Sequence, residues 1–445
     1  MSGEQQQSDS QLKRQIGLAT ATALVVGEVV GVGIFLTPAG MTKSVGSPLL
    51  VLLVWLVAGA MALCGALCYG ELAARFPEAG GGYVYLREAY GPPLAFLFGW
   101  MGLLVLDPGL TAALAVGTAS YIGYALGLSP AWVKALAVAA IILLAVVNIR
   151  GVRLGGWVVR WLTIIKIAVL LFIVLWGFGM RLGDWGNFTP LVAQREGSAP
   201  LAGALAGALV SAFFSFGGWW DLSKLGGEVR DPGRTLPRAY TYGLLVVVAV
   251  YVLTSAAFVY LVPAERVTSG EAFAAQAGEA LFGRAGALIF TCVVVVAVLG
   301  SLAAFTMSAP RVYFAMARDG LFLPAAARLH PRYNTPARAI LMQAALASVL
   351  VLLGNFDDII SYFLFVVVLF IALTVAALFV LRCKGDVPVY KTPLYPVTPI
   401  VYLLLSAALL FLLASGRPKQ ALLGVAVVAA GLPFYYLVFR RRGGG

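Results

Sequence analysis

Long apolar runs separated by short polar segments cover most of this 445-residue sequence. A helix needs about 20 predominantly apolar residues to cross a bilayer, and twelve runs approach or exceed that length. Only 11% of the residues are charged, against about a quarter in a soluble domain. The pattern predicts an all-α polytopic membrane protein with about 12 transmembrane helices, which excludes nucleic-acid-binding, disordered and disulfide-stabilised classes. The predicted spans are 16–42, 48–73, 92–123, 130–149, 157–180, 200–227, 237–262, 284–317, 336–354, 357–382, 397–415 and 418–439, and the connectors 75–90 and 264–283 are predicted to form surface helices.

The distribution of Lys and Arg predicts the orientation of these spans. Twenty-one of these residues fall in loops on the side of the termini and 8 in loops on the opposite side. Cytoplasmic loops carry an excess of Lys and Arg. We therefore expect a multi-pass protein of the cell (cytoplasmic) membrane with both termini in the cytoplasm. The N-terminal stretch MSGEQQQSDSQ is polar, so no cleavable signal peptide is expected.

The residues that catalytic and metal sites need are scarce. The one histidine, His330, lies in a polar connector beside Pro331, and the four cysteines lie in or beside apolar runs. Cys64 and Cys68 share a helix face without an accompanying histidine, and free cysteine usually packs as a small apolar residue. We expect no metal site and no enzymatic activity.

Glycine clusters interrupt two of the predicted spans at mid-membrane depth. The first span carries Gly27, Gly31 and Gly33, and the sixth carries the adjacent pair Gly217 and Gly218. Such clusters serve either close packing between helices or an unwound backbone that approaches a ligand. Because they lie in spans one and six, they occupy matching positions if the first ten spans form two five-helix repeats. Interrupted helices at matching positions are typical of the binding site of a transporter.

The chemistry of unwound helices indicates a ligand. Freed N–H groups of residues 31–33, at the start of the outer half-helix, favour a carboxylate. Freed carbonyl groups near Phe216 and Gly217 favour an ammonium group. A site that offers both fits a zwitterionic amino acid. Its predicted walls are the aromatic side chains of Phe214, Phe216 and Trp219.

Five motifs in consistent order resemble those of the amino acid–polyamine–organocation superfamily, and above all of its L-type amino acid transporter branch. GVGIF resembles the motif of the first helix, and FSFGGWW that of the sixth. EVRDPGRTLPRA resembles the loop after the sixth helix, ARFPEAGGGYVYLREAYG the connector between helices two and three, and PRVYFAMARDGLFLP the end of helix eight. The motifs occupy Gly31–Phe35, Phe214–Trp220, Glu228–Ala239, Ala73–Gly91 and Pro310–Pro324.

The resemblance implies a fold of two inverted five-helix repeats, with broken helices one and six, followed by two additional helices. The implied division of the chain is a cytoplasmic tail at 1–15, a first repeat at 16–180, a second repeat at 200–382, the two additional helices at 397–439, and a tail at 440–445.

The resemblance also implies roles for single residues. The first break would hold the substrate carboxylate, and the second its amino group. Phe214 matches an aromatic gate that swings over the bound substrate, and Ser215 matches a small residue that limits the size of the substrate side chain. The family performs no catalytic chemistry, so no cofactor is expected. The implied substrate-binding residues are Val29, Gly31, Val32, Gly33, Phe214, Ser215, Phe216 and Gly217.

Lys166 lies deep in the fifth predicted span. An ammonium group at the bilayer centre costs at least ~2.5 kcal/mol, so Lys166 should face the bundle interior, unless it extends to the membrane surface. It matches the lysine that sodium-independent members of the superfamily carry where sodium-coupled relatives bind a cation. We therefore expect Lys166 to tether the broken first helix and to contribute to coupling. Proton transfer by its amine is one form that this coupling would take.

Two acidic residues depart from the family pattern. Glu28 lies one turn before Gly31 and is predicted to pair with Lys166 or to carry a proton; the alternatives are a structural contact and a counter-charge for a cationic substrate. Asp107 precedes Pro108 in the third span and is predicted to cap the helix that restarts there.

The inner half of the sixth span carries a second group of charges. Asp221, Lys224 and Glu228 are predicted to form a charge network on the cytoplasmic side. Glu228 and Arg230 are predicted to close an inner gate, with a solvated pair in the loop as the alternative.

These features together predict a secondary active transporter that moves L-amino acids, neutral ones in the first place, by alternating access. It would be sodium-independent and either a proton symporter or an exchanger. The alternative is a carrier of cationic amino acids or polyamines with Glu28 or Asp107 as counter-charge. The expected partners are the amino acid substrate, the lipid bilayer and protons, with no nucleic acid. A disulfide-linked accessory subunit is not expected, because the segment Ser120–Trp132 contains no cysteine.

Overall fold

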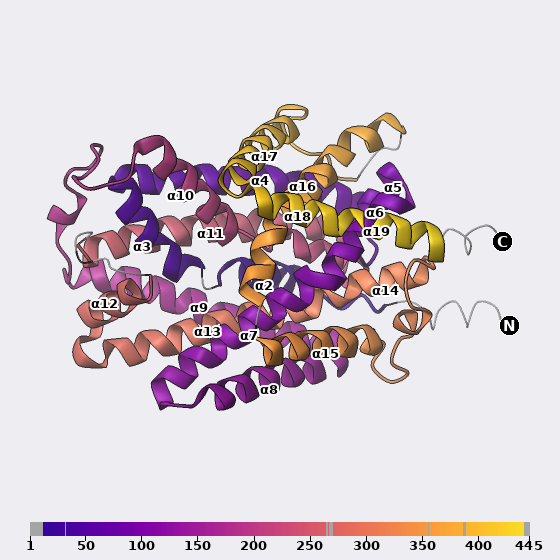
Figure 1. The fold of residues 1–445 in the computed structure, drawn as a ribbon, viewed down its shortest axis with the longest axis horizontal. Helices are drawn as coiled ribbons and strands as arrows, with labels where there is room; N and C mark the ends of the chain where they lie inside the picture. Colours follow the sequence, from indigo (N-terminus) through magenta and orange to yellow (C-terminus); the bar gives the residue numbers. More distant parts are fainter. Residues whose placement is uncertain are drawn as a thin grey trace.

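The computed structural model describes residues 12–31, 33–263, 266, 270–354, 356–385 and 389–439. These residues form a bundle of long helices that run along the longest axis of the molecule (Figure 1). Within the described ranges the only β-type pairings are two isolated bridges, Ile16 with Val229 and Ala79 with Leu225. The prediction of an all-α polytopic membrane protein is therefore confirmed.

Ten helices of the described chain are long and apolar enough to cross a membrane. The first predicted span is divided into α2 (Leu18–Val29) and α3 (Gly33–Val45), and the ninth is the 17-residue α15 (Ala337–Leu353). The other principal helices are α4 (Pro48–Arg75), α6 (Pro92–Met101), α7 (Asp107–Leu126), α8 (Pro130–Ile149), α9 (Val152–Gly179), α10 (Leu201–Ser215), α11 (Pro232–Leu261), α13 (Gly286–Ser308), α14 (Pro310–Arg318), α16 (Phe356–Cys383), α17 (Val397–Gly416), α18 (Pro418–Ala429) and α19 (Gly431–Phe434).

Four of the first eight spans are irregular. The first is interrupted between Val29 and Gly33. The sixth leaves helical geometry after Ser215, turns through 216–218, and continues as the 3₁₀ segment η3 (Trp219–Lys224). The third contains a π-helical segment, η1 (Gly102–Leu106), immediately before α7. The eighth changes from α13 to α14 at a proline, which cannot donate the backbone hydrogen bond of a continuous helix.

One predicted connector differs from its expectation. The segment 75–90 contains α5 (Gly82–Tyr90), whose residues Gly82 to Leu86 are buried, so the prediction of a surface helix is wrong there. The helix packs against α6 and α16. The glycine turn before it is also fixed to η3, because the Gly80 amide donates to the Lys224 carbonyl (3.0 Å). In the second connector, α12 (Gly270–Phe282) packs on α13 and α3.

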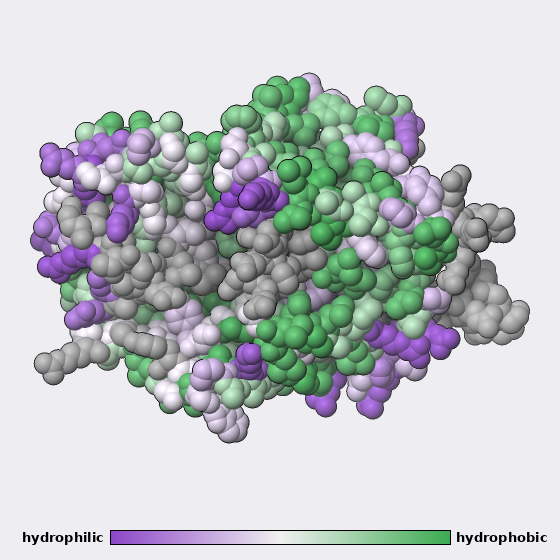
Figure 2. Space-filling model, viewed as in Figure 1, coloured by the Kyte–Doolittle hydropathy of each residue, from purple (hydrophilic) through white to green (hydrophobic). Residues whose placement is uncertain are grey.

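The molecule has two distinct ends and an apolar flank. The chain emerges from α19 at the end of the molecule where α5 and α14 lie, on the right in Figure 1; we call this the terminal end. The opposite end carries α3, α12 and the start of α10. Apolar side chains cover much of the surface between the two ends (Figure 2). Strongly exposed examples are Leu175, Phe411 and Leu437, at 71%, 71% and 72%, as expected for a surface that faces lipid.

Candidate functional site

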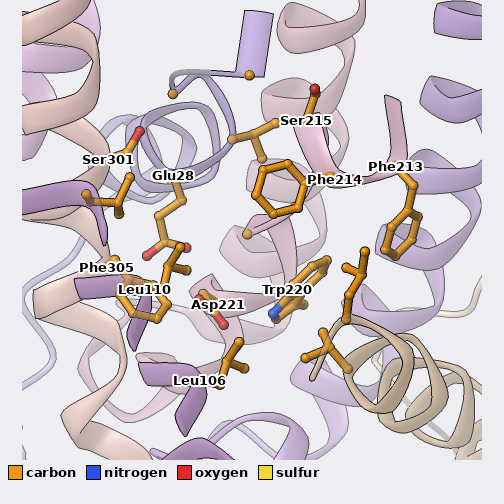
Figure 3. A pocket seen from close by; sticks show the side chains of 18 residues that line it. Glu28, Leu106, Leu110, Phe213, Phe214, Ser215, Trp220, Asp221, Ser301 and Phe305 are labelled. Atoms are coloured by element: carbon orange, nitrogen blue, oxygen red, sulfur yellow. The ribbon is translucent and has the colours of Figure 1, made fainter. Parts of the chain in front are cut away.

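A cavity of about 140 Å³ lies where both interrupted helices meet α7, α13 and α16. With a water's share of liquid volume near 30 Å³, it has room for a small organic solute. Figure 3 shows the carboxyl groups of Glu28 and Asp221 at this cavity, with the rings of Phe214, Trp220 and Phe305 around it. The lining residues are Glu28, Val29, Gly31, Gly33, Leu106, Leu110, Leu114, Phe213, Phe214, Ser215, Gly217, Gly218, Trp220, Asp221, Ser301, Phe305, Leu364 and Val367.

Most of the residues proposed from the sequence as substrate ligands lie at this cavity. Val29, Gly31, Gly33, Phe214, Ser215 and Gly217 are among its lining residues, and Val32 lies outside the described residues. Of these, Phe214 is also exposed, at 45%.

Two of the predicted aromatic walls are wrong. The side chain of Phe216 packs against Trp55 and Tyr251, and Trp219 packs against Tyr69, both away from the cavity. The turn at 216–218 changes the direction in which successive side chains point, so Trp220 lines the cavity instead.

The glycines allow the two broken helices to approach each other. A Cβ atom on Gly33 would lie 2.8 Å from Ser215 Oγ, so a larger residue would force α3 and α10 apart. Gly218 has φ of +104°, a left-handed conformation that favours glycine, and a Cβ there would lie 3.2 Å from Glu28 Cβ. Close approach and backbone conformation therefore both account for the glycine clusters.

Lys166 of α9 holds the end of α2. Its Nζ donates to the carbonyl oxygens of Gly27 (2.9 Å), Val30 (2.7 Å) and, on α13, Ala297 (2.9 Å). Ser301 Oγ donates to the Gly27 carbonyl as well (2.8 Å). The side chain of Lys166 is 1% exposed. The Gly27 and Val30 carbonyls lie where α2 ends and lose their helical partners there, and the ammonium group satisfies them.

A tyrosine from α11 joins the two interrupted helices. Tyr251 Oη lies 2.7 Å from the Val29 carbonyl oxygen and 2.9 Å from the Ser215 carbonyl oxygen. Neither Tyr251 nor Ser301 was identified from the sequence. Each is one of several polar side chains in an apolar span, and the sequence gives no signal that distinguishes it from the others.

Glu28 has a different partner from the one predicted. Its Oε1 accepts a hydrogen bond from Ser308 Oγ (2.9 Å), and its Oε2 is buried without a hydrogen-bond partner among the described residues. Lys166 donates to backbone carbonyls and to Ser301 rather than to Glu28. The predicted Glu28–Lys166 pair is therefore absent, although both side chains border the same end of α2.

Asp107 belongs to a buried charge cluster and caps no helix. Tyr313 Oη donates to Asp107 Oδ2 (2.5 Å), and no side chain caps the start of α7. The capping interpretation is thus wrong, because the π-helical turn before α7 continues the helix through this point. Lys224 Nζ lies 2.9 Å from Asp221 Oδ1 and 3.6 Å from Asp107 Oδ1. The cluster therefore consists of Lys224 between two carboxylates.

Glu228 pairs with Arg311 rather than with Arg230. Arg311 Nε and its terminal nitrogen donate to the two Glu228 carboxylate oxygens (3.2 and 3.0 Å), and both side chains are fully buried. Arg230 is exposed, and its backbone amide donates to the Ile16 carbonyl (2.9 Å). The predicted Glu228–Arg230 gate is therefore wrong: the partner comes from α14, more than 80 residues away.

A further polar layer lies at the terminal end, outside the spans. Tyr83 Oη donates to Asp319 Oδ2 (2.7 Å), and Arg87 forms an ion pair with the same carboxylate. Burial raises the pKa of the Tyr83 hydroxyl, and the neighbouring Asp319 carboxylate raises it further. The Asp319 and Glu88 carboxylates raise the pKa of the Arg87 guanidinium despite its partial burial. Both groups therefore keep their protons at neutral pH.

The fold and the cavity define a class: a helical membrane protein with two interrupted spans facing one central cavity, as in secondary transporters. The chain belongs to the amino acid permease family, whose sequence profile matches residues 16–437. It is therefore an amino acid transporter, and the resemblance drawn from its motifs is confirmed.

Three relatives illustrate the family. The serine/threonine exchanger SteT of Bacillus subtilis (strain 168) is 34% identical over 443 residues, covering 98% of this chain and 99% of the relative. The human b(0,+)-type amino acid transporter 1 is 30% identical, covering 97% and 89%. The human large neutral amino acids transporter small subunit 2 is 31% identical, covering 96% and 80%. All three are transporters rather than enzymes.

Proposed function

We propose that this chain exchanges L-amino acids across the cell membrane by alternating access, with both termini in the cytoplasm. The observation that carries the proposal is the single cavity faced by both interrupted helices. Backbone groups that a continuous helix would use internally are available there. The proposed motion is a rocking of the bundle that contains spans one and six within the repeats 16–180 and 200–382.

The substrate's α-carboxylate and α-amino groups would bind at the two breaks. The first amides of α3, which begins at Gly33, lack helical partners and carry the positive end of the helix dipole, so they suit the carboxylate. The carbonyl groups at the end of α10, near Phe216 and Gly217, suit the ammonium. Phe214, exposed at the edge of the cavity, would close over the bound substrate.

The transporter would work without sodium. Lys166 fills the space at the end of α2 with an ammonium group and already donates to the carbonyls of Gly27 and Val30, which a cation would otherwise contact. The amine occupies the place that a sodium ion would take, so replacing external sodium by choline should leave uptake unchanged.

Exchange is favoured over proton symport because the bacterial relative SteT is named a serine/threonine exchanger. The decisive experiment uses purified protein in proteoliposomes loaded with an unlabelled amino acid. Exchange predicts that labelled uptake depends on internal substrate and shows counterflow. An inward pH step that drives uptake into empty vesicles would instead establish proton symport, and non-saturable flux would contradict a carrier altogether.

Neutral substrates fit the cavity best, since its walls consist mainly of Leu106, Leu110, Leu114 and aromatic rings. Carriage of a cationic amino acid or polyamine is the second candidate, and the free Oε2 of Glu28 favours it. Competition by leucine, alanine, serine, arginine and putrescine against labelled uptake separates the two. We expect alanine, serine or leucine to compete more strongly than arginine; stronger competition by arginine or putrescine would reverse the assignment.

No disulfide-linked subunit should be needed for uptake.

A further inference from the structure

A basic pocket lies at the terminal end, apart from the substrate cavity. It has a volume of about 550 Å³ and is formed by the N-terminal segment, the connection between α8 and α9, and the connection between α14 and α15. Thr335 Oγ1 donates to the Ile149 carbonyl (2.7 Å), which fixes the latter two connections together. The lining residues are Lys13, Gln15, Arg150, Gly151, Arg153, Leu154, Trp157, Arg332 and Tyr333.

The charges of this pocket are all of one sign. Lys13, Arg150, Arg153 and Arg332 are exposed, and no carboxylate is among the lining residues of the described chain. Four cations held this close repel one another, so the arrangement favours an anionic ligand. Hydrophilic residues gather over the connection between α14 and α15 in Figure 2, at the lower right.

The start of α9 adds a second, independent feature. This 28-residue helix begins at Val152 beside the pocket, and its first turn carries no acidic residue. Its first amides have no helical acceptor, and the positive end of the helix dipole lies there. A phosphate group is a good ligand for such a terminus, above all with arginines beside it.

An apolar track continues from the pocket along α9. Leu154, Trp157, Trp161 and Ile165 follow one another at spacings of three, four and four residues, which places them on one face of the helix. Their exposed fractions are 40%, 59%, 49% and 44%. Tryptophan is enriched where membrane-spanning helices meet the headgroup region. The basic pocket thus lies at the polar end of a surface suited to acyl chains.

We propose that this pocket binds the headgroup of an anionic phospholipid, whose acyl chains lie along this face of α9. The phosphate contacts the start of α9 and the guanidinium groups of Arg150, Arg153 and Arg332, and Trp157 packs against the glycerol region. A water-soluble phosphate would use the charges alone and leave the apolar track uncovered, and an acidic peptide would have to enter the bilayer to use it. Basic pockets at the cytoplasmic ends of membrane helices suit such lipids.

The test measures lipid retention by the purified full-length protein, so it is independent of transport. The protein is exchanged into detergent with equal amounts of phosphatidylglycerol and phosphatidylcholine, and bound lipid is counted by native mass spectrometry. We expect retained phosphatidylglycerol and a rise in the melting temperature on titrating it, with no rise from phosphatidylcholine or glycerol 3-phosphate. A rise with glycerol 3-phosphate equal to that with the lipid would show a free-phosphate site and overturn the proposal.

Variants locate the site. Since a basic residue near an anionic surface contributes about 1 kcal/mol, Arg153→Gln and Arg332→Gln should each weaken retention about fivefold, and the double variant more strongly. The matched controls are Arg417→Gln and Lys419→Gln, exposed basic residues at the connection between α17 and α18, which should leave retention unchanged. If a double variant is poorly folded, Lys13→Gln replaces one of its changes. Equal losses in pocket and control variants would mean non-specific attraction and contradict the site.

Discussion

Two buried cations in this transporter are stabilised in opposite ways. Lys166 is surrounded by backbone carbonyls and a hydroxyl, with no carboxylate among its hydrogen-bond partners. Arg311 instead forms a two-pronged pair with Glu228. Both cations are almost completely buried, at 1% and 0% exposure, so solvent contributes little to either.

The two cations depend on different parts of the protein for their stabilisation. Two of the carbonyls around Lys166, those of Gly27 and Val30, are available because α2 ends there, so its stabilisation depends on the shape of the backbone. The stabilisation of Arg311 depends on a second side chain, the carboxylate of Glu228, rather than on a break in a helix. Lys166 therefore links a charge to the helix break beside the central cavity, whereas Arg311 links the segment after η3, through Glu228, to α14 at the terminal end.

The largest expected effect separates these two roles. Lys166→Ala removes the ammonium donor from the Gly27 and Val30 carbonyls at the end of α2, and only the Ser301 hydroxyl remains near them. An unsatisfied buried carbonyl costs about 1–3 kcal/mol, so the break in α2 should lose its defined shape. Initial uptake in proteoliposomes should fall on the order of a hundredfold, while the protein still elutes as a folded species. Lys134→Ala is the control, because Lys134 also donates to a carbonyl, that of Leu352, but is partly exposed. Normal uptake by Lys166→Ala would remove the basis of the comparison.

Arg311→Ala should act on stability first. It leaves the Glu228 carboxylate buried without a partner, which costs roughly 3–5 kcal/mol, so the melting temperature in detergent should drop sharply. The double variant with Glu228→Gln should recover much of the loss, since the uncompensated charge is gone. Arg230→Ala should have almost no effect, because Arg230 is exposed. A destabilisation by Arg230→Ala as large as that of Arg311→Ala would contradict the pairing in the structure.

Tyr251→Phe tests how much a single hydroxyl group contributes to the geometry of the two interrupted helices. The change removes the donor to the Val29 and Ser215 carbonyls while keeping the ring. A loss of roughly 1–2 kcal/mol predicts about tenfold slower uptake. Tyr242→Phe, an exposed residue on the same helix, is the matched control. Uptake that changes equally in both variants would indicate a general effect on α11.

The smallest effect should come from the polar layer outside the spans. Arg87 and Asp319 are partly exposed, with 20% and 27% of their side chains accessible, so solvent screens their pair. Arg87→Gln should lower the free energy of unfolding by about 1 kcal/mol or less. Thermal melts of Arg87→Gln and Arg311→Ala in the same detergent give the contrast directly; equal shifts would show that burial does not govern these pairs.

The helices and their interruptions were largely predictable from the sequence. Apolar length indicated the spans, and the clusters around Gly31 and Gly217 marked both breaks, because glycine weakens a helix wherever it occurs. The position of Lys166 beside α2 followed from the cost of an unsatisfied ammonium in the membrane together with the family resemblance.

The side-chain partners were not predictable in the same way. Phe216 and Trp219 were expected to face the cavity, but the turn through Gly218, at positive φ, breaks the helical phase on which that expectation rested. Glu228 was matched with the nearby Arg230, although its partner Arg311 lies on α14. Such pairings depend on how distant helices pack, which local spacing does not encode.

The geometry around Tyr251 has a consequence for timing. A phenolic hydroxyl has a single hydrogen, yet the Tyr251 oxygen lies within bonding distance of two main-chain acceptors, one on each interrupted helix. At any instant the hydroxyl therefore donates to only one of them, while the Val29 carbonyl also accepts from the Gly31 amide (2.8 Å). The hydroxyl can therefore stay bonded to one interrupted helix at a moment when its contact with the other is lengthened.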